Sequence, residues 1–166
     1  MPATNSRQAK PALPIAFIDS SAKGLCNANI VLQNAMRKLE PEVKNLFLLR
    51  CDELPFVLGD EESIETVFLE LIQMIAEKND TATKMYLHIK TAIDDTEAIQ
   101  AFKQNGFSRY FIQFHTNMTP CEEWIKTSEQ KISDLNTLLA PFAGNLALNP
   151  LKNSGCILSV ALPGKL

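Results

Sequence analysis

Glu70, His88 and His115 carry side chains that commonly take part in proton or phosphoryl transfer. A carboxylate can accept a proton, and an imidazole can exchange protons near neutral pH or accept a phosphoryl group. Cys121 follows His115 by six residues, but the sequence shows no third group that would orient such a pair. The chemistry to be tested is therefore general-base catalysis by Glu70 or phosphotransfer through a histidine.

Glu70 lies in a stretch whose apolar residues recur every three or four positions, which is typical of an amphipathic helix. We expect this helix to begin after Asp60, a good N-cap residue, and to end near Lys78. Met74 follows Glu70 by about one turn, so the two side chains share a face. The same pattern predicts Met74 as an ordinary core residue.

The two histidines lie in stretches where polar and apolar residues alternate, which is typical of half-buried strands. Both fall on the polar side, so we expect surface positions. The sequence predicts helices at 26–40, 60–78, 94–106 and 120–140, and strands at 43–51, 53–60, 84–93 and 108–117, with two more strands forming a hairpin within 144–164.

These elements predict an α/β (α+β) two-layer sandwich, with a mixed, mostly antiparallel sheet of about five strands covered on one face by about three helices. Residues 1–12 are polar and aperiodic, which predicts a flexible arm or linker remnant before a single domain over residues 13–166. Thr119, Pro120 and Glu122 predict a capping box, with proline in the first turn, for the last helix.

Composition excludes several classes of function. The net charge is −3 and lysine and arginine are not clustered, which disfavours nucleic-acid binding. No apolar run approaches the roughly 20 residues that span a bilayer, so we expect no direct membrane insertion. The four cysteines are scattered without a CxxC pair, which indicates neither a zinc site nor a redox pair and suggests a reducing, cytoplasmic setting.

The segment "LPFVLGDEESIETVFLELIQMIAEK", residues 54–78, resembles the ATP-binding catalytic domain of sensor histidine kinases, which shares the fold of gyrase-, Hsp90- and MutL-type ATPases. Its first residues match the family's lead-in "LPxVxGD". The end of the chain, "AGNLALNPLKNSGCILSVALP", matches the family's closing "GGxIxV" and "GxGT" segments at Gly144 and Gly155. The resemblance covers nearly the whole chain beyond residue 13 and implies a histidine-kinase ATPase-like fold.

The nucleotide-binding positions of that family differ here. The resemblance places the family's magnesium-binding asparagine on Met74 and the preceding polar position of the same box on Glu70. A thioether is a poor ligand for Mg²⁺, which prefers oxygen. The adenine-binding motif "DxGxG" falls on Thr116, Met118 and Pro120. Methionine and proline cannot reproduce the backbone freedom of glycine.

The family's second glycine box, which cradles phosphates beside a mobile lid, has no counterpart, because no glycine lies between Thr116 and Leu139. The threonine that follows the last glycine of the closing motif is replaced by Cys156. We therefore predict a degenerate nucleotide site without metal or cofactor. Its positions are Glu70, Met74, Thr116, Met118, Pro120, Gly144, Gly155 and Cys156.

The resemblance implies a pseudo-ATPase domain that acts in two-component signal transduction through protein contacts, in the cytoplasm or as the cytoplasmic part of a larger sensor. Its expected partners are a response regulator, a pair of histidine-bearing dimerisation helices, or a second copy of the chain. Two alternatives stay open: a divergent but active histidine kinase that binds Mg-ATP, with Glu70 as base, and the ATPase-like part of a histidine phosphotransferase. A further hypothesis is that the helix from Pro120 fills the groove left by the nucleotide.

Overall fold

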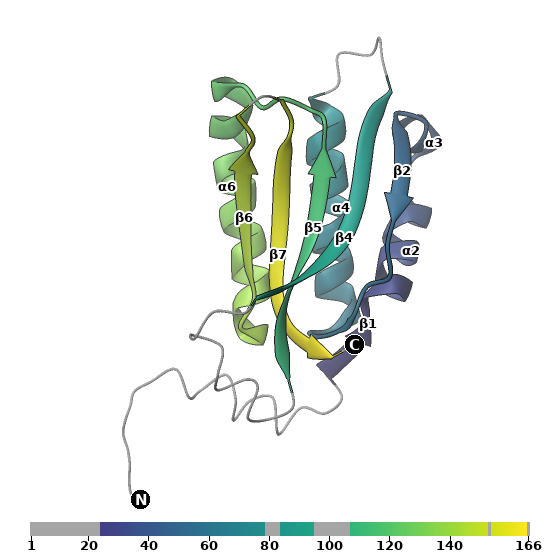
Figure 1. The fold of residues 1–166 in the computed structure, drawn as a ribbon, viewed down its shortest axis with the longest axis vertical. Helices are drawn as coiled ribbons and strands as arrows, with labels where there is room; N and C mark the ends of the chain where they lie inside the picture. The colour runs from purple at the N-terminus through teal and green to yellow at the C-terminus, as the bar shows by residue number, and fades with distance from the viewer. Residues whose placement is uncertain (1–23, 79–83, 95–106, 153, 166) are drawn as a thin grey trace, which may run out of the picture.

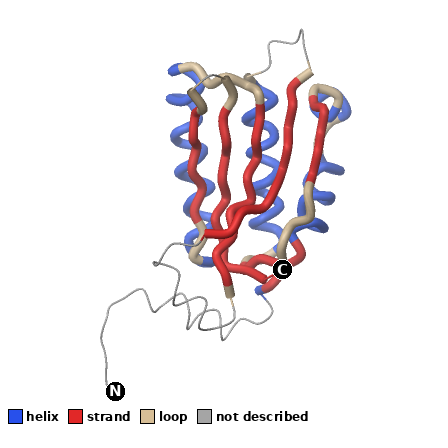
Figure 2. Tube along the Cα trace, viewed as in Figure 1, coloured by secondary structure: helices blue, strands red, loops and turns tan. Residues whose placement is uncertain are grey.

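The computed structural model describes residues 24–78, 84–94, 107–152 and 154–165. One sheet forms the front layer of the molecule in Figure 1, and the three long helices lie behind it. Figure 2 shows the same division, with the helices on one side of the strands. The elements are β1 (Leu25–Asn27), α2 (Ala28–Lys38), α3 (Pro41–Lys44), β2 (Phe47–Cys51), β3 (Phe56–Leu58), α4 (Glu61–Glu77), β4 (Met85–Asp94), β5 (Ser108–Thr116), α6 (Glu122–Leu139), the 3-10 turn η4 (Ala140–Phe142), β6 (Asn145–Pro150) and β7 (Cys156–Lys165).

The described residues form a seven-stranded sheet in the order β1-β3-β7-β5-β4-β2, with β6 also paired to β7. β2 and β4 are parallel, and the other neighbouring strands are antiparallel. The C-terminal strand β7 lies in the middle and pairs with β3, β5 and β6. β1, β2 and β6 each pair with one described strand, so each of them forms an edge of the sheet.

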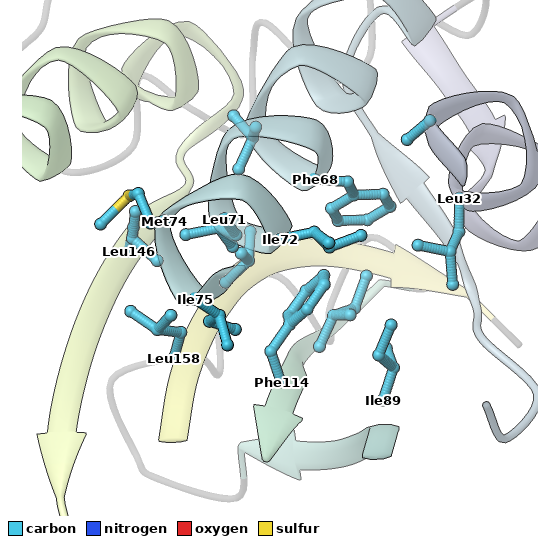
Figure 3. Close-up of a cluster of buried hydrophobic side chains, with 14 of the residues drawn as sticks. Leu32, Phe68, Leu71, Ile72, Met74, Ile75, Ile89, Phe114, Leu146 and Leu158 are labelled. Carbon is cyan, nitrogen blue, oxygen red and sulfur yellow. The ribbon is translucent and has the colours of Figure 1, made fainter. Parts of the chain in front are cut away.

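The central helix, α4, supplies much of the core. Its N-terminus is capped by Asp60, whose Oδ1 accepts a hydrogen bond from the Ser63 backbone N–H at 2.7 Å. Its apolar residues form one stripe that faces the sheet, and Figure 3 shows this stripe against side chains of the strands. The rings of Phe68 on α4 and Phe114 on β5 are 5.6 Å apart. The helix is thereby fixed in rotation relative to the sheet.

The predicted two-layer sandwich is confirmed, and the helices that cover the sheet are α2, α4 and α6. The sheet has more strands than the five expected: β3 lies within the predicted strand 53–60, whereas β1 was not predicted and pairs with β3 at one edge. Strands of three residues are too short to show an alternating pattern. The single turn α3 begins at Pro41, between the predicted helix 26–40 and the predicted strand 43–51, and was not predicted.

Some predictions fall outside the described residues: the arm at 1–12, the domain start at residue 13, and the predicted helix over 94–106, apart from Asp94. That residue is the last of β4 and caps no helix in the described chain. The C-terminal hairpin is confirmed as β6 and β7. None of the described helices is both long and apolar enough to cross a bilayer.

The predicted capping box of the last helix is wrong. α6 begins at Glu122, and its N-cap residue, Cys121, makes no side-chain capping bond. The Thr119 hydroxyl accepts a hydrogen bond from the Gly155 backbone N–H at 3.3 Å instead. The hydroxyl is thus directed at the loop before β7, and Thr119 lies two residues before the N-cap of the helix.

Candidate functional site

The helix α6 lies beside α4 on the covered face of the sheet (Figure 1). Near its start, Trp124 Nε1 donates a hydrogen bond to the backbone carbonyl oxygen of Met74 at 3.1 Å, and both residues are buried. This carbonyl is one of the last four of α4, which have no partner within the helix. The indole therefore satisfies a helix-end acceptor that would otherwise be buried without a partner.

The Met74 side chain is part of the core. It is 2 % exposed, and Figure 3 shows it beside Leu146 of β6. It belongs to one apolar cluster that also contains Met118, Trp124 and Cys156. A thioether in these surroundings contributes packing and offers no oxygen ligand to a hard cation. The structure thus places the predicted site position in the interior of the domain.

Glu70, one turn before Met74, is bonded across the helix interface. Its Oε2 lies 2.9 Å from Lys131 Nζ of α6, and this hydrogen bond raises the pKa of Lys131. The ion pair thus joins this carboxylate of α4 to α6. An open groove of about 500 Å³ borders the pair and is lined by Thr66, Glu70, Lys131, Asp134, Leu135, Thr137 and Leu138.

Thr116, the last residue of β5, pairs with Cys156 at the start of β7. Its Oγ1 accepts a hydrogen bond from the Met118 backbone N–H at 3.1 Å, and both residues are buried. The hydroxyl is therefore used within its own loop. Cys156 is fully buried, and this burial raises its thiol pKa to about 11. At neutral pH the thiol is protonated, and it serves as a small apolar side chain.

Gly155 packs against the end of β5. Its φ is +86°, and a Cβ atom at this position would lie 2.3 Å from the Thr116 carbonyl oxygen. Only glycine fits both the backbone angle and the space. Its N–H donates to Thr119, and Pro120 follows in the loop that leads to α6. The structure therefore brings Thr116, Met118 and Gly155 together, with Pro120 close by in the chain.

Gly144 lies elsewhere. It precedes β6, whereas Gly155 precedes β7, and these strands are antiparallel over six residue pairs. A strand of that length spans roughly 17–20 Å, so the two glycines lie at opposite ends of the hairpin. A Cβ atom on Gly144 would lie 2.6 Å from Leu162 Cδ2. Close packing of the end of α6 onto β7 is therefore sufficient to explain this glycine.

The first turn of α6 carries Glu122 and Glu123. The N-terminus of a helix attracts anions through its dipole and free N–H groups, and carboxylates placed there offset that attraction for a phosphate. This negative charge lies next to the loop that contains Met118 and Pro120. The local charge disfavours a polyphosphate at the position where the family places its glycine boxes.

The two histidines are neighbours on the other face of the sheet. His88 and His115 are paired across β4 and β5, with ring centroids 6.4 Å apart. His88 Nε2 lies 3.1 Å from Asp52 Oδ2, and His115 Nε2 lies 3.2 Å from the side-chain oxygen of Gln113. Burial, Lys90 and His88 lower the pKa of His115, which is therefore neutral at pH 7. Both histidines are separated from the α4–α6 interface by the sheet, and neither lies on a helix.

Sequence reasoning missed two contacts that define this region, Trp124 to Met74 and Lys131 to Glu70. The partners are far apart in the chain, and no spacing rule links them. One signal was available, because Trp124 is the sole tryptophan and a buried indole N–H needs an acceptor. The acceptor itself is a backbone atom, which the sequence cannot identify.

Solved structures of sensor histidine kinases have the same fold. The chain aligns with the Acinetobacter baumannii histidine kinase AdeS at 10 % identity and a TM-score of 0.60, over 91 % of this chain and 75 % of that one. It aligns with the nucleotide-free catalytic domain of the histidine kinase ThkA at 15 % identity and a TM-score of 0.57, over 84 % of this chain and 95 % of that one. It aligns with the mycobacterial sensor histidine kinase MprB at 11 % identity and a TM-score of 0.56, over 85 % of this chain and 97 % of that one.

No protein-family model matches the sequence, and no curated protein sequence matches it. The structural comparisons nevertheless cover most of the chain and nearly all of two of the three kinase structures. The fold is therefore that of the ATP-binding catalytic domain of sensor histidine kinases, as the sequence resemblance implied. At identities of 10–15 %, this similarity concerns the fold and not the activity.

Proposed function

We propose that this chain is a histidine-kinase-like domain of two-component signalling that does not use ATP and acts through contacts with other proteins. The observation that carries the proposal is the hydrogen bond from Trp124 to the Met74 carbonyl. It fixes α6 against the part of α4 where the family resemblance places the magnesium ligand. Side chains of the domain occupy this region.

The chemistry of the neighbouring residues supports the same proposal. Magnesium requires oxygen ligands, and Met74 supplies a buried thioether. The phosphate chain of ATP requires flexible backbone N–H groups and positive charge. The loop between β5 and α6 has no residue with positive φ, and two glutamates follow it. Lys131 is bound to Glu70.

The helix that was expected to fill the groove starts after Pro120 and is α6. Its first turn carries Trp124, which is 7 % exposed and packs in the same cluster as Met74 and Met118. We include in the proposal that this indole takes the volume left by the lost nucleotide. Substituting a smaller side chain at Trp124 is then expected to open a cavity without creating phosphate ligands.

Thermal unfolding in the presence of Mg-ATP, Mg-ADP or EDTA tests the loss of nucleotide binding. A ligand present at 100 times its Kd stabilises a protein by about 2.7 kcal/mol. For a domain of this size the corresponding rise in Tm is about 5–10 °C. We expect no shift at millimolar nucleotide, with an active histidine-kinase catalytic domain as the positive control. A rise of this size that requires Mg²⁺ would overturn the proposal in favour of a divergent active kinase.

The proposed partners are a response regulator, a pair of histidine-bearing dimerisation helices, or a second copy of the chain. Binding of purified receiver domains and dimerisation-helix pairs to the immobilised chain tests this part, with unrelated acidic proteins of similar size as controls. Saturable binding to one of them supports the signalling role. If no two-component protein binds and the chain does not self-associate, that role is wrong.

A further inference from the structure

The face of the sheet that points away from α2, α4 and α6 carries a group of basic side chains. No described helix lies on this face, which is turned toward the viewer in Figure 1. Buried residues of β4 and β5, such as Ile89 and Phe114, point toward the helices, and strand residues alternate between the two faces. The residues between the buried ones are half-buried and face the other way: His88, Lys90, Gln113 and His115.

Strand pairing brings these four side chains together. His88 lies opposite His115, with ring centroids 6.4 Å apart, and Lys90 lies opposite Gln113. Arg50 of the neighbouring strand β2 is the partner of His88 on its other side, and its side chain is 67 % exposed. We call these five residues the histidine cluster. They come from three strands, so the cluster does not show as a basic run in the sequence.

The histidine cluster holds more positive than negative charge. In the described chain, the carboxylate that contacts it is that of Asp52, whose Oδ2 lies 3.1 Å from His88 Nε2 and whose Oδ1 lies 3.6 Å from Arg50 Nε. No carboxylate of a described residue pairs with Lys90 or with His115. The cluster therefore has one excess positive charge when its histidines are neutral and three when both are protonated.

The other groups near this face do not change the balance. Arg109 has its own partner farther along the same two strands, with Nε 3.7 Å from Asp94 Oδ2. Glu53 is exposed and lines the groove between α2 and β2. The adjacent strand β7 places Ile157 and Ser159 beside the cluster, and neither carries a charge. Neighbouring elements of the described chain therefore leave the positive charge of the cluster in place.

The same arrangement opposes protonation of His115. Burial, Lys90 and His88 lower its pKa, because a further cation here would have no anion beside it. In the neutral rings, His88 Nε2–H donates to Asp52, and His115 Nε2–H donates to the Gln113 side-chain oxygen at 3.2 Å. Protonation adds an N–H at Nδ1 of each ring, for which the described residues provide no hydrogen-bond partner. The cluster therefore gains both charge and free donors as the pH falls.

From these observations we propose that the histidine cluster binds a tetrahedral oxyanion, that is, a phosphate or sulfate group. The Lys90 ammonium and the Arg50 guanidinium supply charge-assisted donors, and the guanidinium fork fits two oxygens of such a group. The two histidines add the donors that protonation creates, so the anion is held more tightly at low pH. A doubly charged anion matches the excess charge of the cluster better than a single carboxylate does.

Histidine NMR signals report on this site alone, because the chain contains two histidines and both belong to the cluster. The probe is sodium sulfate, which stays doubly charged between pH 5 and pH 8. It is titrated into the full chain, with sodium chloride of equal ionic strength as the control. At pH 6 we expect saturable shifts of both histidine signals and a rise in the pKa of His115, because the bound anion favours the protonated ring.

Proton binding and anion binding are linked, so the affinity for sulfate is expected to fall about three- to tenfold from pH 6 to pH 8. A titration at pH 6 in which sulfate produces no saturable shift beyond that of chloride would overturn the inference. So would an affinity that is the same at both pH values, because the histidines would then take no part in binding.

Lys90→Gln removes one cation and keeps a polar side chain. We expect sulfate to bind about fivefold or more weakly to this variant. Without sulfate, the pKa of His115 is expected to be higher than in the wild type, because Lys90 lowers it there. Lys126→Gln is the matched control, because this exposed lysine of α6 lies on the other side of the sheet and its loss changes the net charge equally. Circular dichroism confirms that both variants are folded. Equal weakening by both, or none by Lys90→Gln, would overturn the site.

A second titration identifies the source of the anion, since a phosphate group can be a free ion or part of another molecule. Inorganic phosphate and a short phosphoserine peptide are compared at pH 6. Tighter binding of the peptide supports a site for a phosphate group held by a partner, and equal binding supports a site for the free ion. Failure of both probes to bind would overturn the assignment to phosphate.

The inference does not rest on the proposed loss of ATP binding. A nucleotide held through the histidine cluster needs no Mg²⁺ and is weakened by Lys90→Gln. A retained nucleotide site between the helices needs Mg²⁺ and is insensitive to this substitution, because the sheet separates it from Lys90. The two proposals can therefore fail separately.

Discussion

Trp124 and Met74 are joined by a hydrogen bond between an indole N–H and a helix-end carbonyl, at 3.1 Å, in the interior of the protein. This contact ties the first turn of α6 to the last turns of α4. In the related fold a nucleotide would require space at this part of α4. Here the contact couples two helices directly, so removing it measures how much this hydrogen bond contributes to the stability of the domain.

Trp124→Phe keeps an aromatic ring and removes the donor. The Met74 carbonyl then remains buried without a partner, so we expect a loss of about 1–3 kcal/mol in the free energy of unfolding. Urea unfolding followed by circular dichroism measures it, because Trp124 is the sole tryptophan and its fluorescence is lost with it. An unchanged midpoint would mean that the hydrogen bond contributes nothing.

Met74→Asn introduces the residue that the histidine-kinase resemblance places at this position. We expect it to destabilise the domain by about 1–3 kcal/mol, because a buried amide beside Leu146 lacks partners, and not to create Mg-ATP binding. Met74→Leu is the control and is expected to cost less than about 1.5 kcal/mol. A nucleotide-dependent rise in the Tm of Met74→Asn would show that the rest of the site is still competent.

Gly155→Ala tests the contact between the start of β7 and the end of β5. The positive φ and the 2.3 Å approach to the Thr116 carbonyl oxygen predict a loss of roughly 2–5 kcal/mol. Ser154→Ala, next to it and exposed, is expected to change stability by less than about 0.5 kcal/mol. Equal midpoints for the two variants in chemical denaturation would contradict the close packing described here.

Thiol labelling separates the four cysteines into two classes. Cys51 and Cys121 are exposed and are expected to react in the native protein, with Cys51 the slower because burial and Asp52 raise its pKa. Cys26 and Cys156 are buried, with pKa values raised to about 11, and are expected to react only on unfolding. Mass spectrometry after timed alkylation at pH 8 distinguishes the four sites. Rapid native labelling of Cys156 would show that the end of β7 opens.

The same two buried thiols predict the direction of a pH effect. Their pKa values are higher in the folded state than the value of about 8.5 expected for the unfolded chain. The unfolded state therefore loses these protons first, and stability falls as the pH rises from about 8.5 toward 11. Below pH 8 this contribution is constant. Cys156→Ala and Cys26→Ala are each expected to flatten the alkaline part of the stability profile.

The sequence was a good guide to α4. Its apolar spacing and Asp60 located the helix and its cap, because both signals lie within a few neighbouring residues. It was a poor guide to the start of α6, because Thr119 bonds to Gly155 far along the chain. Local sequence patterns predict the elements that local interactions determine. They cannot predict a residue such as Thr119, whose hydrogen-bond partner lies far along the chain.

The candidate site was predictable only as a set of positions. The family resemblance identified Met74, Thr116 and Gly155, and the structure supplied what surrounds them. It separated Gly144 from the others, which register matching alone could not do. The partners Trp124 and Lys131 were not identifiable, because their contacts arise from the packing of two helices and not from any short sequence pattern.

The position of β7 has a consequence for how the chain is made. β7 follows the other described strands along the chain, and it is the strand that joins β3, β5 and β6. Until it leaves the ribosome, the apolar face of α4 and the inner edges of β3 and β5 have no permanent cover. The domain therefore cannot complete its fold until β7 has been synthesised. The nascent chain must remain soluble with these surfaces open, which makes this interval the one in which aggregation or chaperone binding is most expected.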